Sequence, residues 1–442
     1  MSIRILLAAA LAGLVLAAAA PAWAQIGLPG GVPGLPSLPG QLPDRLPVDP
    51  GRLQNGLRDR IDGALQAPSR LRDLIRRSDG ALEADPYGWP VARAEIVGVD
   101  PSPAGRRIAL DAGFTIVRET RLDGLELAVV VLAPPPGLSL RGAVERLREL
   151  DPDGIWEFNH VYSPAGALTG EAGPPPPASG APASPPRAGA IRVGLIDTGV
   201  NAGHPALAGV AVRQRGFAGP DRPGAHGTAV ASLLSGRSGG FSGAAPGAAL
   251  FVADVYGGSP AGGSSTGVAQ ALAWMVQSDV PVVNVSLVGP RNALVEAAVR
   301  RATGRGVLIV AAVGNDGPAA APLYPASYPG VVGVTAVNAR GRVLPEAARG
   351  PQVDFSAPGA DMAAAGPGPG YVSVRGASFA APLVAGLLAR RRARGGDAVQ
   401  ALAAEARDMG ARGPDPVYGR GLVAADLRVD PAAVGARGRL SR

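Results

Sequence analysis

Hydrophobic and polar positions change their period repeatedly between residues 92 and 163, and each change predicts a different element. Alternating or continuous apolar stretches indicate strands, whereas apolar positions at helical spacing indicate helices. We predict strands over 92–99, 114–121, 125–132 and 155–162, and helices over 103–112 and 139–150. The order strand, helix, strand, strand, helix, strand is that of the split βαβ or ferredoxin-like fold, so we expect an α+β domain over residues 91–163.

From residue 190 to about residue 427 the pattern is different, because apolar strands alternate with helical stretches. This alternation predicts an α/β domain with a mostly parallel sheet. Residues 164–189 separate the two domains and consist mainly of Pro, Ala and Gly, so we predict a solvated linker that is open to cleavage. Residues 428–442 are predicted to form a loose basic tail.

Residues 1–24 have the pattern of a secretory signal. Arg4 supplies a basic start, an apolar run follows, and Ala22-Trp23-Ala24 provides a small-x-small cleavage site. The apolar run is shorter than the ~20 residues that a spanning helix requires, which favours a cleaved signal over a membrane anchor. We therefore predict export, to the periplasm or the extracellular space.

Residues 25–90 lie between this signal and the predicted α+β domain. They begin with a Gly/Pro/Leu-rich stretch that has no usable periodicity. Residues 52–78 then place leucines and isoleucines at helical spacing among arginines. Two interpretations of this basic amphipathic helix stay open: it lies on a membrane surface, or it packs on the domain that follows.

The net charge of +7 and the pI near 10.4 raise the question of a nucleic-acid partner. Every basic residue is an arginine, however, and the arginines are scattered through a chain rich in Ala, Gly and Pro. This composition indicates GC-rich codon usage, so we expect no nucleic acid to bind. The chain has no cysteine, which excludes disulfides, thiol nucleophiles and thiolate metal sites, and without lysine it has no Walker A loop.

The chain has only three histidines, which limits the choice of a general base. His160 falls in a predicted strand and His204 in a loop, whereas His226 opens a run of small residues that lets a helix begin close to its neighbours. Asp197 ends a buried strand, where sites form in α/β sheets, and Ser378 lies between a Gly turn and an apolar helix. Taken alone, each of these two is more simply a loop or capping residue. Together with His226 they supply an orienting acid, a base and a nucleophile.

Three segments resemble the catalytic signatures of the subtilisin-like serine proteases, the subtilase or peptidase S8 family. They are Asp197-Thr198-Gly199, His226-Gly227-Thr228 and Gly376-Ala377-Ser378-Phe379-Ala380-Ala381-Pro382. The order Asp, His, Ser is that of subtilisin, and the missing Gly two places after Ser378 argues against an α/β-hydrolase elbow. The resemblance covers roughly residues 190–427. It implies a subtilisin-like three-layer domain and a serine endopeptidase that forms an acyl-enzyme on Ser378.

The segment 311–317 resembles the family's oxyanion segment and implies Asn315 as an amide donor. The resemblance also implies the walls of a cleft that binds an extended peptide. These candidate substrate-binding residues are Ser286, Leu287, Val288, Gly289, Gly262, Gly263 and Ser264. Val288 stands where the family usually has Gly, so we predict no preferred substrate residue. Phe379 stands where many relatives have Met.

The α+β domain directly precedes the catalytic domain, as inhibitory pro-domains do in this family. The resemblance therefore implies an autoprocessed precursor in which residues 91–163 block the cleft until the linker is cut. We expect protein or peptide substrates, a monomer, and no cofactor for the chemistry. Dispersed histidines do not suggest zinc, and structural calcium, common in relatives, is not placed by any dense Asp cluster.

Two rival hypotheses belong to other classes of function. The first is a catalytically silent binding protein that keeps the subtilisin fold. The second is a basic protein that binds a surface, and it rests only on the pI.

Overall fold

The computed structural model describes residues 67–169 and 189–436. The predicted signal over residues 1–24 lies outside these ranges, as do residues 25–66, most of the predicted linker and the end of the predicted tail. None of the helices in the described ranges combines the length and the apolar character that a membrane span requires.

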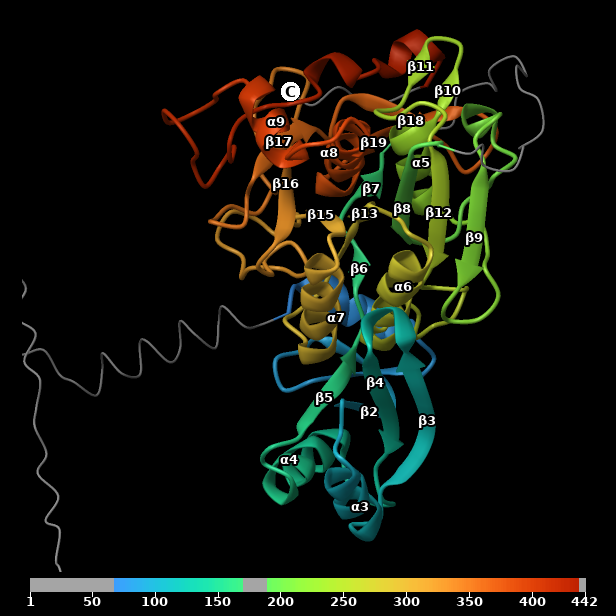
Figure 1. Cartoon of the computed structure of the whole chain (residues 1–442), viewed down its shortest axis with the longest axis vertical. Coiled ribbons are helices and arrows are strands. Elements are labelled where there is room, and N and C mark those ends of the chain that lie inside the picture. The colour runs from blue at the N-terminus through green and yellow to red at the C-terminus, as the bar shows by residue number, and fades with distance from the viewer. Residues whose placement is uncertain (1–66, 170–188, 437–442) are drawn as a thin grey trace, which may run out of the picture. The chain divides into compact units, whose positions relative to one another are not determined.

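Seven parallel strands form the central sheet of the larger domain, in the order β17, β16, β15, β13, β8, β12, β9 (Figure 1). Their bounds are β8 (Arg192–Asp197), β9 (Val212–Gly216), β12 (Ala249–Asp254), β13 (Val282–Val285), β15 (Leu308–Ala312), β16 (Val331–Val337) and β17 (Phe355–Pro358). After β8 the chain places β9 at the edge and β12 between β8 and β9, and it then crosses to the other side of β8 at β13. The carboxyl end of β8 therefore lies where the strand order reverses, which is where open α/β sheets place their sites.

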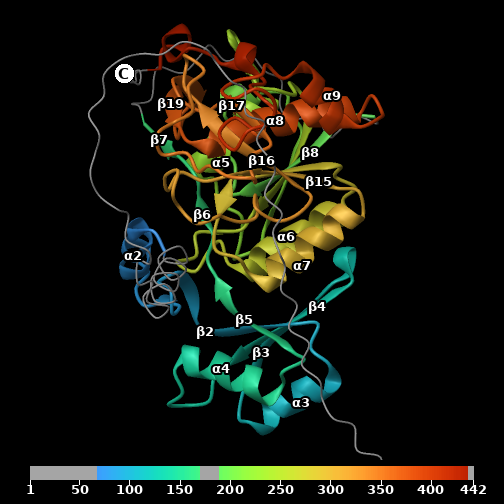
Figure 2. The same ribbon diagram turned by 90° about the vertical axis from the view of Figure 1, so that its left-hand side faces the viewer.

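Helices cover both faces of this sheet. α5 (Ala225–Ser235) packs with α8 (Ala377–Arg392) on one face, and α6 (Ser265–Gln277) packs with α7 (Ala293–Gly304) on the other (Figures 1 and 2). Alternate residues of β8 serve the two faces: Leu195 belongs to the apolar cluster beneath α5 and α8, and Ile196 to the cluster beneath α6 and α7. The predicted three-layer α/β fold with a mostly parallel sheet is confirmed.

Shorter elements complete the larger domain. They are β10 (Arg237–Ser238), β11 (Phe241–Ser242), β14 (Leu287–Val288), β18 (Met362–Ala365), β19 (Tyr371–Arg375), α9 (Ala398–Glu405) and the 3₁₀ turns η2 (Pro205–Leu207), η3 (Ala425–Leu427) and η4 (Pro431–Val434). α9 packs on α8, and β18 pairs with β19 beside the central sheet.

Residues 82–160 form a separate antiparallel sheet with two helices, which we call the small domain. Its elements are β1 (Leu82–Ala84), β2 (Pro90–Val99), α3 (Pro103–Asp111), β3 (Thr115–Leu122), η1 (Asp123–Leu125), β4 (Leu127–Ala133), α4 (Leu140–Leu150) and β5 (Ile155–His160). From edge to edge the strands run β5, β2, β4, β3, with β1 added beside the start of β2. From β2 onward, the elements follow the predicted strand and helix order of the ferredoxin-like fold.

The small domain rests on α6 and α7 of the larger domain (Figures 1 and 2). Asn159, near the end of β5, accepts hydrogen bonds from the Ser265 hydroxyl (2.8 Å) and from the Thr266 N–H (3.2 Å) in the first turn of α6. Asn292 caps α7 and also donates through Nδ2 to the Phe158 carbonyl (3.0 Å). The end of β5 thus satisfies polar groups at the starts of α6 and α7. One of them is the Thr266 N–H, which lies in the first turn of α6 and has no partner within the helix.

α2 (Ser69–Arg76) is the described part of the basic amphipathic stretch. Leu71 is buried in the same apolar cluster as Trp89 and Ala165, and the Arg70 side chain reaches Asp316 of the larger domain. For residues 69–76, the structure therefore favours packing on the protein over lying on a membrane surface. The part of the stretch before residue 67 lies outside the described ranges.

Candidate active site

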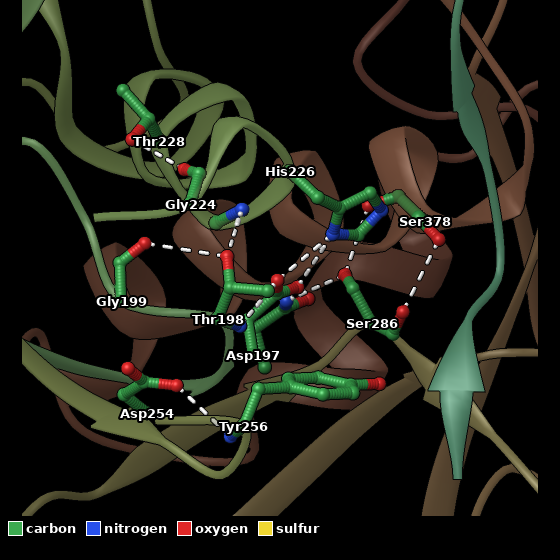
Figure 3. A network of polar contacts seen from close by, with 12 residues as sticks. Asp197, Thr198, Gly199, Gly224, His226, Thr228, Asp254, Tyr256, Ser286 and Ser378 are labelled. Carbon is green, nitrogen blue, oxygen red and sulfur yellow. Dashed lines mark hydrogen bonds and ion pairs between the residues drawn. The ribbon is translucent and has the colours of Figure 1, made fainter. Parts of the chain in front are cut away.

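Asp197 and His226 form the centre of the candidate site (Figure 3). Asp197 ends β8 and is fully buried, while His226 is the second residue of α5. The His226 Nδ1–H lies 2.8 Å from Asp197 Oδ1 and 2.9 Å from Oδ2. Oδ1 also accepts the Thr198 N–H at 2.7 Å, so the carboxylate is held from two sides. With its proton on Nδ1, the imidazole presents Nε2 as an acceptor.

Ser378 is the second residue of α8, which packs beside α5, and it faces His226 in Figure 3. Its hydroxyl donates to the Ser286 carbonyl at 3.2 Å, and His226 Nε2 is buried with no hydrogen-bond partner among the described residues. The Ser286 hydroxyl in turn donates to the Ser378 carbonyl at 2.9 Å. The hydroxyl of Ser378 is therefore next to the base but turned away from it, so a rotation about one bond precedes any proton transfer.

Two N–H donors converge on one peptide carbonyl beside Ser378. The Ser378 backbone N–H donates to the Ala165 carbonyl at 3.1 Å, and Asn315 Nδ2 donates to the same oxygen. Asn315 Oδ1 accepts the Ala377 N–H at 3.1 Å, which fixes the side-chain amide with its NH₂ group toward Ala165. Two donors aimed at a single carbonyl oxygen form the arrangement that stabilises an oxyanion.

Gly376 allows this close approach. Its φ is +133°, and a Cβ built there would lie 2.7 Å from Gly166 Cα and 2.8 Å from both the Ala165 oxygen and Asn315 Nδ2. Any side chain at position 376 would therefore push the bound peptide out of the donors' reach, and the backbone conformation itself favours glycine.

Residues 161–169 run through the candidate site as an extended strand. β6 (Ser163–Pro164) pairs antiparallel with β14, and β7 (Ala167–Leu168) pairs antiparallel with β19. Residues 164–169 open the stretch that we predicted as a linker, and residues 161–163 end the predicted α+β domain. In the structure they pair with the larger domain on both sides of the Ala165 carbonyl, as an extended substrate does when it adds a strand to a protein edge.

The predicted cleft walls surround the first half of this strand. The Tyr162 N–H donates to the Gly263 carbonyl at 2.8 Å, and Val161 forms a bridge with Ser264. On the other side, Leu287 and Val288 form β14 itself. The Ala165 N–H donates to the Ser286 carbonyl at 3.2 Å.

Tyr162 fills a closed pocket between these walls. It is fully buried, and its hydroxyl donates to the Pro290 carbonyl at 2.9 Å, while a Cβ on Gly289 would lie 2.7 Å from its ring. Tyr256, which the sequence did not single out, donates its hydroxyl to the Tyr162 carbonyl at 2.8 Å. Gly262 backs this tyrosine, since a Cβ at Gly262 would lie 2.6 Å from the Tyr256 backbone. Burial raises the pKa of both tyrosines well above the ordinary value.

The other two histidines are engaged elsewhere. His160 pairs through Nε2 with the Asp85 carboxylate (3.1 Å). His204 accepts the Ala206 N–H at Nδ1 (3.0 Å) and donates from Nε2 to the Gly370 carbonyl (3.1 Å). Burial lowers the pKa of His204, because the charged imidazolium is disfavoured away from water. Of the three histidines, only His226 lies beside a serine and an acid at the strand ends.

Several residues of the site gave no sequence signal of their own. Thr198 accepts the Gly227 N–H at 2.9 Å and so ties the end of β8 to the start of α5. Asn284 donates to the Ser286 hydroxyl at 2.8 Å. Thr198 lies within the segment Asp197-Thr198-Gly199, and Asn284 lies two residues before the predicted substrate-binding residue Ser286, but neither was predicted to take part in the site. Arg70 forms two hydrogen bonds of 2.8 Å with the carboxylate of Asp316, the residue after Asn315. It lies in the stretch 52–78, for which the sequence predicted an amphipathic helix and no role in the site.

The described ranges hold no group of three or more histidine, cysteine, aspartate or glutamate side chains that could hold a metal ion. The zinc and calcium expectations are not tested further by the structure.

Comparison with known proteins gives independent information about the family of this chain. The subtilase family model matches residues 189–406. The chain is 36% identical over 209 residues to the thermostable alkaline protease of Halalkalibacterium halodurans, covering 46% of this chain and 57% of that protein. It is 37% identical over 204 residues to subtilisin Savinase of Lederbergia lenta, covering 45% of this chain and 75% of that protein. The chain thus spans little more than half the length of the first of these relatives.

Among solved structures, fervidolysin from Fervidobacterium pennivorans, described as a keratinolytic enzyme related to subtilisin, aligns with a TM-score of 0.62. The alignment covers 76% of this chain and 61% of fervidolysin at 22% identity. At this identity the match speaks for the fold alone.

Proposed function

This chain belongs to the subtilase family, and from that premise we propose that it is a serine endopeptidase made as a precursor that first cuts itself. The observation that carries the proposal is the Ala165 carbonyl, which accepts hydrogen bonds from the Ser378 N–H and from Asn315 Nδ2. A peptide carbonyl held by two donors, beside a serine and a histidine–aspartate pair, is bound as a substrate's scissile carbonyl would be.

In the proposed mechanism, the Ser378 hydroxyl rotates away from the Ser286 carbonyl toward His226 Nε2. It attacks the carbonyl carbon while His226 takes its proton, and the buried Asp197 carboxylate orients the ring and stabilises the imidazolium. The oxyanion forms between the Ser378 N–H and Asn315. His226 then gives the proton to the leaving nitrogen, and water releases the acyl group from Ser378 by the same path in reverse. None of these steps requires a cofactor.

The proposed substrates are proteins or peptides bound in extended form. Support comes from the two strands β6 and β7, which show how a peptide can pair with β14 on one side of the reacting carbonyl and with β19 on the other. The small domain would act as an intramolecular inhibitor, because its last strand leads directly into the peptide that fills the site. We further propose that the protein is exported, on the pattern of residues 1–24, and works as a monomer.

A catalytically silent binding protein with the same fold is the alternative, and a comparison of the wild type with Ser378→Ala separates the two. Expressed in parallel, the wild type should shorten from precursor to product and hydrolyse casein, whereas Ser378→Ala should stay full length and inactive. Ser242→Ala is a matched control, because among the described residues the hydroxyl of Ser242, at the end of β11, bonds only to the carbonyl of its neighbour Gly243. If the wild type and Ser378→Ala behave alike in both assays, the protease proposal fails.

A further inference from the structure

The residue that follows the held carbonyl, Gly166, has no room for a side chain. A Cβ built on it would lie 2.7 Å from Phe379 Cε2, 3.2 Å from Phe379 Cδ2 and 3.1 Å from Ser378 Cβ. The nearest of these distances is far inside the usual 3.5–4.0 Å contact between carbon atoms. The side chains of Phe379 and Ser378 therefore leave no space at position 166 for a substituent larger than hydrogen.

The backbone does not explain the glycine. Gly166 is not among the residues with a positive φ, in contrast to Gly376 at +133°. An L-residue could therefore adopt the conformation at position 166 without backbone strain. The requirement for glycine comes from the neighbouring side chains, and chiefly from Phe379.

Phe379 cannot easily withdraw. Its side chain is fully buried, and its ring lies 5.3 Å from the His226 ring, centroid to centroid. Moving the phenyl group to admit a methyl would disturb either the packed core beneath α8 or the catalytic histidine, and close-packed side chains resist such shifts.

The bound peptide cannot easily shift either. On one side the Ala165 carbonyl is held by its two donors. On the other side Ala167 and Leu168 pair with Arg375 and Val374 of β19, and the Thr169 N–H donates to the Ser373 carbonyl at 2.9 Å. Gly166 is therefore fixed from both ends against the face of Phe379.

We propose that Phe379 makes this enzyme selective for glycine directly after the scissile bond, and that Ala165–Gly166 is the bond the precursor cuts. The proposal rests on the serine endopeptidase function and names a specificity determinant of that same site. Ser378 Oγ bonds to the Ala165 carbonyl carbon as the bond to the Gly166 nitrogen breaks, and His226 delivers the proton to that nitrogen. Water then hydrolyses the Ala165 ester, which frees the Ala165 carboxylate and restores Ser378.

The main experiment uses the full chain and measures the rate of self-processing by gel, with N-terminal sequencing of the product. The wild-type product should begin at Gly166. Gly166→Ala adds only the Cβ and should slow the cut at this bond roughly tenfold or more, since one extra methyl in a closed contact carries such a cost. Gly304→Ala is the matched control, because a Cβ built at Gly304, at the end of α7, meets no atom within 4 Å, and this variant should process at close to the wild-type rate.

The same Gly166→Ala change is then placed in chains that carry Phe379→Ala or Phe379→Leu. Removing the ring should bring the ratio of glycine to alanine processing rates from tenfold or more down to roughly one to three, as expected when a clash is relieved. The ratio remains informative even if the new side chain lowers catalysis for both substrates. A pair of quenched peptides that differ only in Gly or Ala after the cut, tested on the matured enzymes, should give the same ratios.

The outcomes separate cleanly. A wild-type cut at another bond, an unchanged rate in Gly166→Ala, or a glycine preference that survives both Phe379 variants overturns the inference while leaving the protease function intact. If Gly166→Ala moves the cut to another bond that precedes a glycine, the selectivity is supported. Absence of processing and of casein hydrolysis in the wild type contradicts the underlying function instead.

Discussion

The Asn315 side chain forms two hydrogen bonds, one that fixes its own orientation and one to the carbonyl group in the site. Its Oδ1 accepts the Ala377 N–H, and this bond points Nδ2 at the Ala165 carbonyl. A donor fixed before the reaction needs no reorganisation when charge develops on the oxygen. The amide is therefore a preorganised part of the site and more than a neighbour of Ser378.

We expect Asn315→Ala to lower kcat by about 10²–10³-fold with little change in KM, a magnitude taken from the corresponding donor of subtilisin itself. The measurement is steady-state hydrolysis of a peptide substrate by the matured variants. Asn315→Asp is the matched control for shape, because it keeps the acceptor for Ala377 but places negative charge beside the oxyanion. It should be at least as impaired as Asn315→Ala, and near wild-type activity in the aspartate variant would contradict an oxyanion role.

His204 gives a second prediction at this scale, on stability. Its pKa is lowered from 6.5 by burial, so the folded state holds the proton less well than the unfolded state. The contribution of His204 to stability is then fully present above pH 6.5 and is lost as the pH falls below it. In the Ser378→Ala background, which does not digest itself, His204→Gln should flatten the loss of unfolding free energy between pH 7.5 and pH 5.5. Urea unfolding curves measure this, and parallel pH profiles with and without His204 would count against it.

The triad could be predicted from the sequence because each member lies in a short, fixed motif next to an element end. Asp197 ends a strand that is apolar from Val193 to Ile196, and His226 and Ser378 are each the second residue of a helix that begins with small residues. The structure brings the three together at the carboxyl edge of the sheet. Tyr256 and Arg70 could not be predicted this way, because their roles depend on Tyr162 and Asp316, partners that lie 94 and 246 positions away.

At the scale of elements, α2 holds the peptide in the site through the side chain of Arg70. Arg70 binds the Asp316 carboxylate through two nitrogens and donates to the Ser163 hydroxyl at 3.0 Å. Asp316 directly follows the oxyanion donor Asn315, and Ser163 belongs to β6. One guanidinium thus connects the helix before the small domain with the site wall and with the strand that occupies it.

We expect Arg70→Gln to shorten the delay between self-processing and the appearance of casein hydrolysis. A partly exposed ion pair contributes about 0.2–1 kcal/mol, so the delay should shorten by roughly 1.5- to 5-fold. Arg76→Gln is the matched control, because Arg76 lies on the same helix and, within residues 67–169 and 189–436, pairs only with Asp73. The exchanged pair Arg70→Asp with Asp316→Arg should restore part of the delay. Equal delays in Arg70→Gln and Arg76→Gln would show that the contact has no inhibitory role.

The two helices and the strands β2 to β5 of the small domain could be predicted from the sequence because each has its own periodicity, whereas the three-residue strand β1 was not predicted. The helix predicted over 139–150 is observed as α4 (Leu140–Leu150), and the strand predicted over 92–99 is observed as β2 (Pro90–Val99). β6 and β7 could not be predicted, because a strand of two residues is too short to show a period. They form only because β14 and β19 offer them edges, and those partners are more than 100 residues away.

At the scale of the whole described molecule, the two domains share their buried polar contacts as well as an apolar surface. Asn159 of the small domain bonds with Ser265 and Thr266, and Asn292 of the larger domain bonds with Phe158. Tyr162, two residues after the small domain, fills a pocket of the larger domain. These contacts do not depend on the peptide bond after Ala165.

We therefore expect the processed chain to remain together at first. When a serine-directed inhibitor stops the reaction just after processing, the two fragments should separate on a denaturing gel but elute as one species in native size exclusion. Asn159→Ala should weaken the association, because it leaves buried groups at the start of α6 unsatisfied at a cost of about 1–3 kcal/mol. Separate elution of wild-type fragments from the outset would contradict this prediction.

The pairing of β7 with β19 has a consequence for the direction of the reaction. A cut after Ala165 would leave the new amino group of Gly166 tethered beside the acyl-enzyme, at a high local concentration compared with a free amine. Hydrolysis and resealing would then compete at the same serine, and the intact and nicked chains would interconvert. The step that makes maturation irreversible is the departure of residues 166–169 from β19, so a variant that loosens this pairing should mature faster without any change in the chemistry of Ser378.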